Sequence, residues 1–330
     1  MEKVRVGLVG CGGFLRHRLQ QTVNVPEAEV VAMCDIVPSQ IAETKDRYPQ
    51  YAGVTEYSDF YEMVEEGGLD AVMLVTPHNI HAAHVVHAFG ADLNVLVEKP
   101  LSCTVADCEA CIEARDKSGK VGAVSYQRHG LPEIQWLRKA LTGGEHGEIQ
   151  MIHSMLSQDW LQFTNGTWRQ DPEVSQGGML NDSGSHIFDV LLWSTGLTPS
   201  SVCCFADNRG TRVDIDTATT IQFKEGALAT VSIMGNANMW HERHVFVLER
   251  AMITWTDGVT EMRQRTGTDT PGELQTLGDW PAATTPDKNF IDAVLGRAEV
   301  LAPFECGMDV VKLTRACYES AEAGGKAVEL

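Results

Sequence analysis

The stretch from Asn94 to Pro100, with the sequence NVLVEKP, places charged side chains where a buried strand ends. Its first four residues are those of a short apolar strand, and Glu98, Lys99 and Pro100 follow without a loop of small residues. A lysine in a partly desolvated cleft has a lowered pKa, which suits proton transfer near neutral pH. We expect Glu98 to hold the ammonium or its neighbours in place, and Pro100 to fix the turn. A solvated Glu98–Lys99 pair in a loop is the alternative.

A second group of reactive side chains lies in the stretch QGGMLNDSGSHIFD, residues 176–189. Asp182 and His186 are four residues apart, so on a helix that opens after the double glycine both lie on one face near its N-terminus. A carboxylate beside an imidazole orients the ring and supports its cationic form, which is the arrangement of a general base with its orienting group. The alternative is an acidic helix cap with a packed core histidine.

A glycine-rich turn, GLVGCGGFLRHR, follows the first apolar segment. Gly10, Gly12 and Gly13 would allow a tight turn and let backbone amides approach a pyrophosphate at the N-terminus of the next helix. Asp35 ends the next strand-like segment about 20 residues on, where an acid would bind the adenosine ribose. Capping of the following helix is the alternative role for Asp35. The turn departs from G-x-G-x-x-G at Leu15, where glycine or alanine would allow close helix–strand packing.

The residues beside Asp35 indicate which dinucleotide binds. Ile36 and Val37 follow the acid, and no arginine or lysine stands next to it. A 2′-phosphate would therefore meet a carboxylate and no cation, so the sequence favours NAD over NADP.

Three cysteines have the spacing of a metal cluster without its other requirements. Cys103, Cys108 and Cys111 match the C-x4-C-x2-C spacing of a ferredoxin. The last two fall in an expected helix, whereas a cluster needs a wrapping loop and a fourth thiolate. We therefore interpret them as core or interface thiols.

Four histidines, His78, His81, His84 and His87, recur every three residues. On a helix they fan over half the circumference, so no three can converge on one ion, and we expect no metal. His81, near the helix N-terminus at a strand end, remains a candidate site residue.

The elements that must position these residues follow from the polarity pattern. Apolar segments at 4–10, 29–35, 70–77, 94–100 and 121–126 alternate with helix-like segments such as 58–68 and 104–119. This predicts an α/β fold with a doubly wound parallel sheet. After residue 126 the strand-like segments alternate in polarity, as half-buried antiparallel strands do. We therefore expect one domain over 1–126 and a second over 127–330.

Composition excludes several classes of protein. A length of 330 residues suggests two domains, and no apolar run is long enough to cross a bilayer. The net charge of −19 disfavours nucleic acid as a partner, because an acidic surface repels phosphate backbones. The chain enters a strand without a signal-type segment, and its nine cysteines are odd in number and scattered. These features predict a cytoplasmic protein with reduced thiols.

Several motifs together resemble the glucose–fructose oxidoreductase/inositol dehydrogenase/MocA (Gfo/Idh/MocA) family of nicotinamide-dependent oxidoreductases. They are GCGGF, TPHNIHAAHVVHAFGADLNVLVEKPL and WRQDPEVSQGGMLNDSGSHIFD, and the resemblance covers the whole chain. EKP at a strand end combined with D-x-G-S-H downstream is more specific than the glycine turn. The resemblance implies an NAD-binding Rossmann domain and an α+β domain with a large open, mostly antiparallel sheet. It also implies a homodimer or homotetramer formed through that sheet.

The same resemblance implies roles for individual residues. Lys99 would contact the nicotinamide ribose and the substrate, and Asp182 and His186 would form the substrate-side pair. Further substrate contacts would come from Arg128, Trp168 and Arg169. The cofactor would be lined by Gly10, Gly12, Gly13, Phe14, Leu15, Asp35, Thr76, Pro77, His81, Glu98, Lys99 and Gln127.

The predicted activity is an NAD(H)-dependent transfer of a hydride between nicotinamide and a ring secondary alcohol or ketone of a sugar, glycoside or cyclitol. Either His186, oriented by Asp182, or Lys99 would take the hydroxyl proton. One alternative is an NAD-dependent glycoside-cleaving enzyme that oxidises a ring carbon transiently and then eliminates the aglycone. Another is a non-catalytic NAD-binding sensor, which would have no need of Lys99, Asp182 and His186 together.

Overall fold

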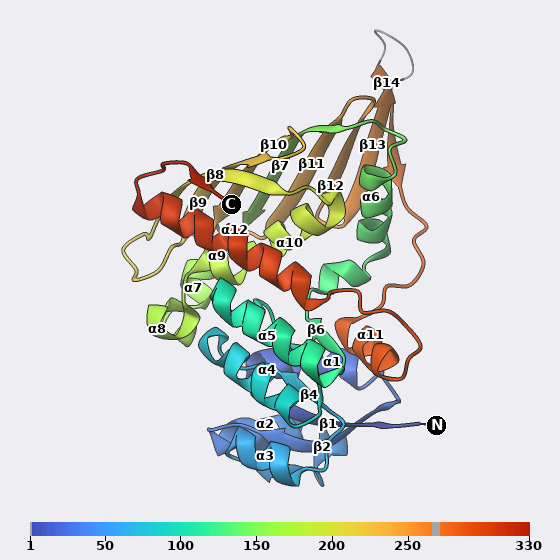
Figure 1. The fold of residues 1–330 in the computed structure, drawn as a ribbon, viewed down its shortest axis with the longest axis vertical. Coiled ribbons are helices and arrows are strands. Elements are labelled where there is room, and N and C mark those ends of the chain that lie inside the picture. Colours follow the sequence, from blue (N-terminus) through green and yellow to red (C-terminus); the bar gives the residue numbers. More distant parts are fainter. Residues whose placement is uncertain (1, 266–270) are drawn as a thin grey trace. The chain divides into compact units, whose positions relative to one another are not determined.

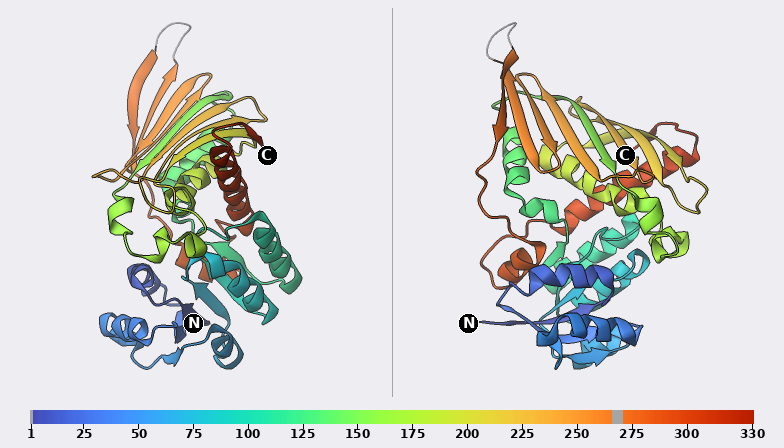
Figure 2. Two further views of the ribbon diagram at one scale, coloured as in Figure 1. Left: turned by 90° about the vertical axis from the view of Figure 1, so that its left-hand side faces the viewer. Right: turned by 180° about the vertical axis from the view of Figure 1, so that it is seen from behind.

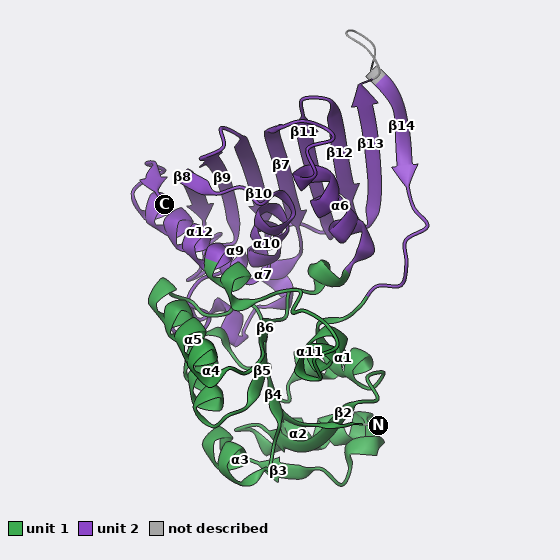
Figure 3. Cartoon of the chain, turned by 45° about the vertical axis from the view of Figure 1, so that its right-hand side comes forward, with its two compact units in different colours: residues 1–130, 284–308 green, residues 131–283, 309–330 purple. Residues whose placement is uncertain are grey.

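The chain forms two compact units, which are coloured separately in Figure 3. The computed structural model describes residues 2–265 and 271–330. Unit 1 comprises Met1–Gly130 and Thr284–Met308, and unit 2 comprises Leu131–Ala283 and Asp309–Leu330. The two units therefore differ from the two contiguous segments expected from the sequence, because residues 284–308 return to unit 1.

Helix α11 (Pro286–Val294) accounts for this return. Its Phe290 and Ile291 are fully buried in the apolar core of unit 1, in one cluster with Leu8 and Leu15. Helical periodicity in the sequence does not tell which of two sheets a helix will cover.

Unit 1 is built on six parallel strands in the order β3-β2-β1-β4-β5-β6. Both β4 and the last three residues of β5 are completely buried, as expected of parallel strands covered on both faces. The predicted parallel sheet is confirmed. Its strands are β1 (Val4–Val9), β2 (Ala28–Cys34), β3 (Thr55–Tyr57), β4 (Ala71–Leu74), β5 (Asn94–Val97) and β6 (Gly122–Val124).

Helices lie on both sides of this sheet (Figure 3). Helix α1 packs against α11, while α4 packs against both α3 and α5. Short 3-10 turns at His78–Ile80 and Gln127–Gly130 follow β4 and β6. The helices are α1 (Gly13–Thr22), α2 (Pro38–Arg47), α3 (Phe60–Glu66), α4 (His81–Gly90), α5 (Val105–Ser118) and α11.

Unit 2 contains a nine-stranded sheet in the order β14-β13-β12-β11-β7-β10-β9-β8-β15 (Figure 1). The pair β7 and β10 is parallel and the other neighbours are antiparallel, which confirms the mostly antiparallel sheet. The strands are β7 (Ile149–Ser157), β8 (Pro199–Asp207), β9 (Asp216–Phe223), β10 (Leu228–Met234), β11 (His241–Leu248), β12 (Ala251–Thr256), β13 (Val259–Arg265), β14 (Pro271–Leu277) and β15 (Val328–Glu329).

The helices of unit 2 gather on one face of this sheet (Figure 2). Strands β9 and β11 alternate buried and more exposed residues, as strands with one covered face do. The helices are α6 (Pro132–Thr142), α7 (Trp160–Phe163), α8 (Pro172–Ser175), α9 (Met179–Asp182), α10 (Gly184–Thr195) and α12 (Phe304–Glu322), whose first residues belong to unit 1. Across the described residues, no helix combines the length and the apolar character needed to span a membrane.

Candidate active site

The glycine turn after β1 brings three strand ends of unit 1 together. Gly10 has a φ of +85°, and a Cβ atom there would lie 2.5 Å from the carbonyl oxygen of Val75 after β4. Its amide donates to the carbonyl of Cys34 at the end of β2, at 2.9 Å. Only glycine suits both the backbone conformation and this close approach.

The N-terminus of α1 is open next to this turn. A Cβ atom at Gly13, the first helical residue, would meet no heavy atom within 4 Å, and one at Gly12 would meet only Gln40 at 3.9 Å. Backbone amides at an uncrowded helix N-terminus can bind a phosphate. Leu15 occupies the position of the last glycine in G-x-G-x-x-G. Its side chain is fully buried in the core, whereas Phe14 is exposed. The helix therefore packs with leucine at this position.

Asp35 fastens the end of β2 to the glycine turn. One carboxylate oxygen accepts a hydrogen bond from the amide of Cys11 at 2.7 Å, and the other accepts from the amide of Val37 at 2.8 Å. Val37, not Asp35, is the N-cap of α2, so the helix-cap alternative does not describe this residue. Each carboxylate oxygen has a second lone pair, with which it could accept a ribose hydroxyl.

Arg16 is a cation near this turn that the sequence did not indicate. Arg16, one turn into α1, donates from Nη1 to the carbonyl of Cys11 at 2.9 Å and to Oε1 of Gln40 at 3.1 Å. Its Nη2 lies 3.1 Å from a carboxylate oxygen of Glu43. Because the guanidinium is engaged by backbone and carboxylate, it is not free to receive a 2′-phosphate without losing these contacts.

The Glu98–Lys99–Pro100 turn follows β5 at the same edge of the sheet. The peptide bond between Lys99 and Pro100 is cis. Glu98 is buried, and its carboxylate contacts the guanidinium of Arg18 on α1. The other oxygen accepts the backbone N–H of Lys99 at 3.3 Å. Glu98 therefore holds its neighbour through the main chain and through α1, a connection that no local pattern could indicate.

His81, the first residue of α4, holds the same turn. Its ring is fully buried, with Nδ1 2.8 Å from the carbonyl oxygen of Pro100 and Nε2 2.9 Å from that of Thr76. Burial lowers the pKa of His81, so the ring is neutral at pH 7 and donates to one of the two carbonyls at a time. The ring thus faces the backbone of two candidate cofactor segments, one containing Thr76 and Pro77 and the other Lys99.

The other clustered histidines and cysteines serve packing. His84 stacks on Phe60 with ring centroids 4.2 Å apart, and His87 packs edge-on against Tyr61 at 4.6 Å. All nine cysteines are free thiols. Among residues 2–265 and 271–330, no group of three or more potential ligands could hold a metal ion.

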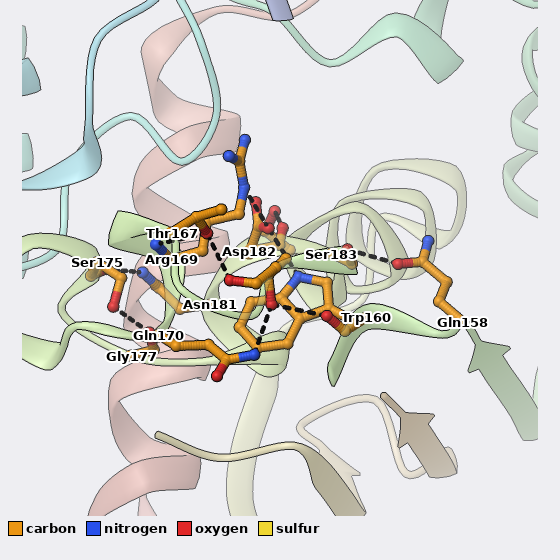
Figure 4. A network of polar contacts seen from close by, with 12 residues as sticks. Gln158, Trp160, Thr167, Arg169, Gln170, Ser175, Gly177, Asn181, Asp182 and Ser183 are labelled. Atoms are coloured by element: carbon orange, nitrogen blue, oxygen red, sulfur yellow. Dashed lines mark hydrogen bonds and ion pairs between the residues drawn. The ribbon is translucent and has the colours of Figure 1, made fainter. Parts of the chain in front are cut away.

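Asp182 is the centre of a polar network in unit 2 (Figure 4). Its Oδ2 accepts the indole N–H of Trp160 at 2.9 Å and Nε–H of Arg169 at 3.1 Å. The guanidinium of Arg169 in turn lies 4.5 Å over the ring of Trp168. The structure therefore brings Trp168, Arg169 and Asp182 together, and Trp160 is a member that sequence reasoning missed.

The segment that carries Asp182 and His186 is not one helix. Asp182 ends α9, Ser183 intervenes, and α10 begins at Gly184. Ser183 keeps right-handed helical backbone angles (φ −77°, ψ −33°), so the expected single helix is divided at one residue into two consecutive helices. His186 is half-buried in the first turn of α10.

Asp214 fixes the double glycine before α9. It accepts hydrogen bonds from the amides of Gly178 at 2.7 Å and Leu180 at 2.8 Å, and from the hydroxyl of Tyr318 at 2.6 Å. Burial raises the pKa of Asp214 despite these donors. Asp214 stands in a loop before β9 with no recognisable spacing to the motif, so no sequence signal pointed to it.

Comparison with known families agrees with this geometry. Residues 4–126 match the profile of the oxidoreductase family with an NAD-binding Rossmann fold, and residues 134–258 match the Gfo/Idh/MocA C-terminal domain. The chain belongs to the Gfo/Idh/MocA family.

Two dehydrogenases resemble this chain in sequence, and a third resembles it in fold. Inositol 2-dehydrogenase of Salmonella paratyphi B is 32% identical over 58% of this chain, but the match spans only 54% of that protein. D-glucoside 3-dehydrogenase of Escherichia coli is 26% identical over 99% of this chain and 97% of its own length. Levoglucosan dehydrogenase, solved with NADH and levoglucosan, shares the fold with a TM-score of 0.87 at 20% identity, covering 99% of each chain.

Proposed function

We propose that this protein is an NAD(H)-dependent dehydrogenase or reductase acting on a ring secondary alcohol or ketone of a sugar, glycoside or cyclitol. The observation that carries the proposal lies in unit 1. The glycine turn, with Asp35 bonded to it, and the Lys99 turn follow strands of one parallel sheet at their carboxyl ends. Ligands of such sheets bind outside the carboxyl ends of the strands, so Lys99 belongs on the cofactor side.

The residues that would hold NAD fit its parts. The open N-terminus of α1 suits the pyrophosphate, and Asp35 suits the hydroxyls of the adenosine ribose. Thr76 and Pro77, as well as Gln127 after β6, are proposed to line the remainder. When bound, NAD supplies the acceptor for the hydride that leaves the substrate carbon.

The protein's own part is to remove the hydroxyl proton as the hydride leaves. We assign this to a ring nitrogen of His186, which must be neutral to accept the proton. The ammonium of Lys99 would stabilise negative charge on the substrate oxygen. Asp182 favours the imidazolium that forms, and Arg169, paired with Asp182 at 3.1 Å, holds that carboxylate and moderates its charge.

Substrate contacts are proposed for Arg128, Trp168 and Arg169. Trp168 offers an aromatic face, and Arg169 offers the guanidinium N–H groups that do not bond to Asp182, a combination suited to a polyhydroxylated ring. The similarity to a cyclitol dehydrogenase and to a glucoside dehydrogenase supports this substrate class.

We also propose a cytoplasmic homo-oligomer formed through the sheet of unit 2. The sheet face opposite the helices carries an apolar row across four adjacent strands, in which Leu228, Met151, Val247 and Met252 are successive partners. Leu228 and Met252 are exposed in the single chain. A row of this kind suits contact with a second copy of the sheet. Light scattering coupled to gel filtration measures the oligomeric state.

A substrate panel tests the activity. Inositols, pyranoses and glycosides are incubated with NAD, and in parallel with NADP, while absorbance at 340 nm reports NADH. Oxidation of at least one class, with NAD preferred, is the expected result. Release of an aglycone from glycosides without net NADH would instead assign the protein to redox-assisted glycoside cleavage. If the protein binds NAD but oxidises no compound of the panel, the non-catalytic sensor is the remaining alternative.

A further inference from the structure

A buried ion cluster joins three segments of unit 1 that are far apart in the sequence. Arg18 on α1 contacts a carboxylate oxygen of Glu98 through Nη1, which also donates to the hydroxyl of Ser125 at 2.6 Å. Its Nη2 lies 3.0 Å from Asp287 on α11, and its Nε donates to the same carboxylate at 3.2 Å. The side chains of Arg18, Glu98 and Asp287 are 5%, 8% and 1% exposed. We call these three residues the Arg18 cluster.

The Arg18 cluster contains one guanidinium and two carboxylates. The negative charge of Asp287 is stabilised by groups other than Arg18. Asp287 lies in the first turn of α11, where the helix dipole favours negative charge, and the hydroxyl of Thr22 donates to it at 2.5 Å. Glu98 depends on Arg18 to a greater extent. Buried ion groups of this kind add little net stability compared with apolar packing, but loss of one member leaves a buried charge without its partner. The cluster is therefore better suited to fixing geometry than to stabilising the fold.

What the Arg18 cluster fixes is the turn that carries Lys99. The amide of Glu98 donates to the carbonyl of Leu74 on β4 at 2.9 Å, and its carboxylate accepts the Lys99 amide at 3.3 Å. Lys99 is thus held from both the main chain and the side chain of its neighbour. The anchor of that side chain, Arg18, lies on α1, whose N-terminus is the proposed pyrophosphate site.

We propose that Arg18 and Glu98 are positioning residues that set Lys99 relative to the cofactor, with Asp287 holding Arg18 in place. One rigid helix then carries both the phosphate-binding turn and the anchor of the Lys99 turn. The inference rests on the proposed function, because it gives Lys99 a role at the substrate oxygen. It assigns Glu98 to the support of Lys99 and not to contact with NAD.

A matched ion group in the same unit provides the control. Arg115 on α5 contacts Glu305 on α12 through two nitrogens, at 2.9 Å and 2.7 Å, and Asp116 at 2.7 Å. This group also has one guanidinium and two carboxylates, but Glu305 is exposed and none of the three adjoins a proposed site residue. Glu305→Gln removes a carboxylate charge from an arginine without touching the Lys99 turn.

The experiment compares Glu98→Gln and Asp287→Asn with Glu305→Gln. Both test variants keep side-chain size while removing one charge and replacing one acceptor oxygen by an NH2 donor. Four quantities are measured for each variant: kcat and KM on the substrate that the panel identifies, the Kd of NAD by titration calorimetry, amide hydrogen exchange in peptides covering residues 97–102, and Tm. Lys99→Met serves as a second reference, because it removes the ammonium and leaves the cluster intact.

For Glu98→Gln we expect kcat to fall about ten- to a hundredfold, since a misplacement of about 1 Å can cost about a hundredfold. The Kd of NAD should change little, and exchange in residues 97–102 should rise. Asp287→Asn should show the same pattern more weakly, and it decides the question if Glu98→Gln does not fold. Glu305→Gln should retain wild-type kcat and exchange. Lys99→Met should lose turnover with unchanged exchange.

Wild-type kcat and exchange in both test variants would overturn the inference. So would a rise in the Kd of NAD that matches the fall in kcat, because Glu98 would then be a cofactor contact. If the wild-type protein turns over no substrate, the proposed function fails and exchange alone decides the positioning role. In that case increased exchange in Glu98→Gln supports the inference, and unchanged exchange refutes it.

Discussion

Replacing Asp35 by alanine separates two contributions of a single carboxylate. The first is to the fold, through the hydrogen bonds from the amides of Cys11 and Val37 at 2.7 and 2.8 Å. The second is to the cofactor, through the proposed contact with the adenosine ribose. Because both contributions come from the same side chain, the variant must be measured for stability and for binding.

The magnitudes follow from the contacts. Hydrogen bonds to a charged group contribute about 1.5–3 kcal/mol each, and the half-exposure of Asp35 places its two at the lower end, so unfolding should become easier by about 3 kcal/mol. A lost ribose contact of the same kind, about 1.5–3 kcal/mol, weakens NAD binding about ten- to a hundredfold. The Kd of NADP should stay the same or fall, since a charge that repels its 2′-phosphate is removed.

Asp59→Ala is the matched control for this variant. Asp59 also accepts two backbone hydrogen bonds, from the amides of Tyr61 and Glu62 at 2.8 and 3.0 Å, as the N-cap of α3 in the same unit. Its removal should cost about 0.5–2 kcal/mol of stability and leave the Kd of NAD unchanged. Urea denaturation and titration calorimetry with NAD and NADP give the required values. If Asp35→Ala loses stability but keeps the wild-type Kd of NAD, or if the wild-type protein binds NADP as tightly as NAD, the assignment is refuted.

Three further outcomes are expected. Lys99→Met should reduce kcat about a hundredfold or more with NAD affinity largely retained, because a positive charge near the developing alkoxide acts mainly in the transition state. Steady-state kinetics that stay near wild type would show that Lys99 is only a loop residue. Asp182→Asn should move the rising limb of the pH profile of kcat/KM to lower pH and lower its plateau. His186→Ala should flatten that limb and reduce kcat/KM about a hundred- to ten-thousandfold. Profiles unchanged in both variants would transfer the base role to Lys99. Burial, followed by the charges of His81 and His87, lowers the pKa of His84 from 6.5 to about 4. As the pH falls, His84 is therefore protonated in the unfolded chain before it is protonated in the folded one. The free energy of unfolding should decline as the pH falls from about 6.5 towards 4. Urea midpoints measured across this range should fall less in His84→Gln, and an equal fall in both proteins would contradict this.

The sequence predicted well what depends on strand order and local spacing. Apolar runs placed the parallel strands, and the carboxyl ends of those strands placed Gly10, Asp35 and Lys99 at one edge of a sheet. These predictions succeed because side-chain period and strand direction are local properties of the chain.

Partners of the candidate residues were beyond such reasoning. Glu98 was expected to hold the Lys99 ammonium or its neighbours in place. It accepts the Lys99 amide, and it also contacts Arg18, which lies 80 positions away in the sequence. Asp182 was expected to orient His186, and its carboxylate also accepts hydrogen bonds from Trp160 and Arg169, which no sequence spacing linked to it. Buried polar groups bond to whichever partner the tertiary fold brings near, and the periodicity of the sequence does not identify that partner.

The return of residues 284–308 to unit 1 has a consequence for dissecting the protein. An expression fragment ending near residue 130 would contain every strand of the nucleotide-binding sheet but none of α11. It would expose the apolar surface that Phe290 and Ile291 cover, and it would leave Arg18 without Asp287. Unit 1 of this protein is therefore not self-contained as a fragment ending near residue 130. A self-standing version requires residues 284–308 to be spliced back, for which the hydrogen bond between the Thr284 amide and the Gly130 carbonyl at 3.1 Å marks a natural junction.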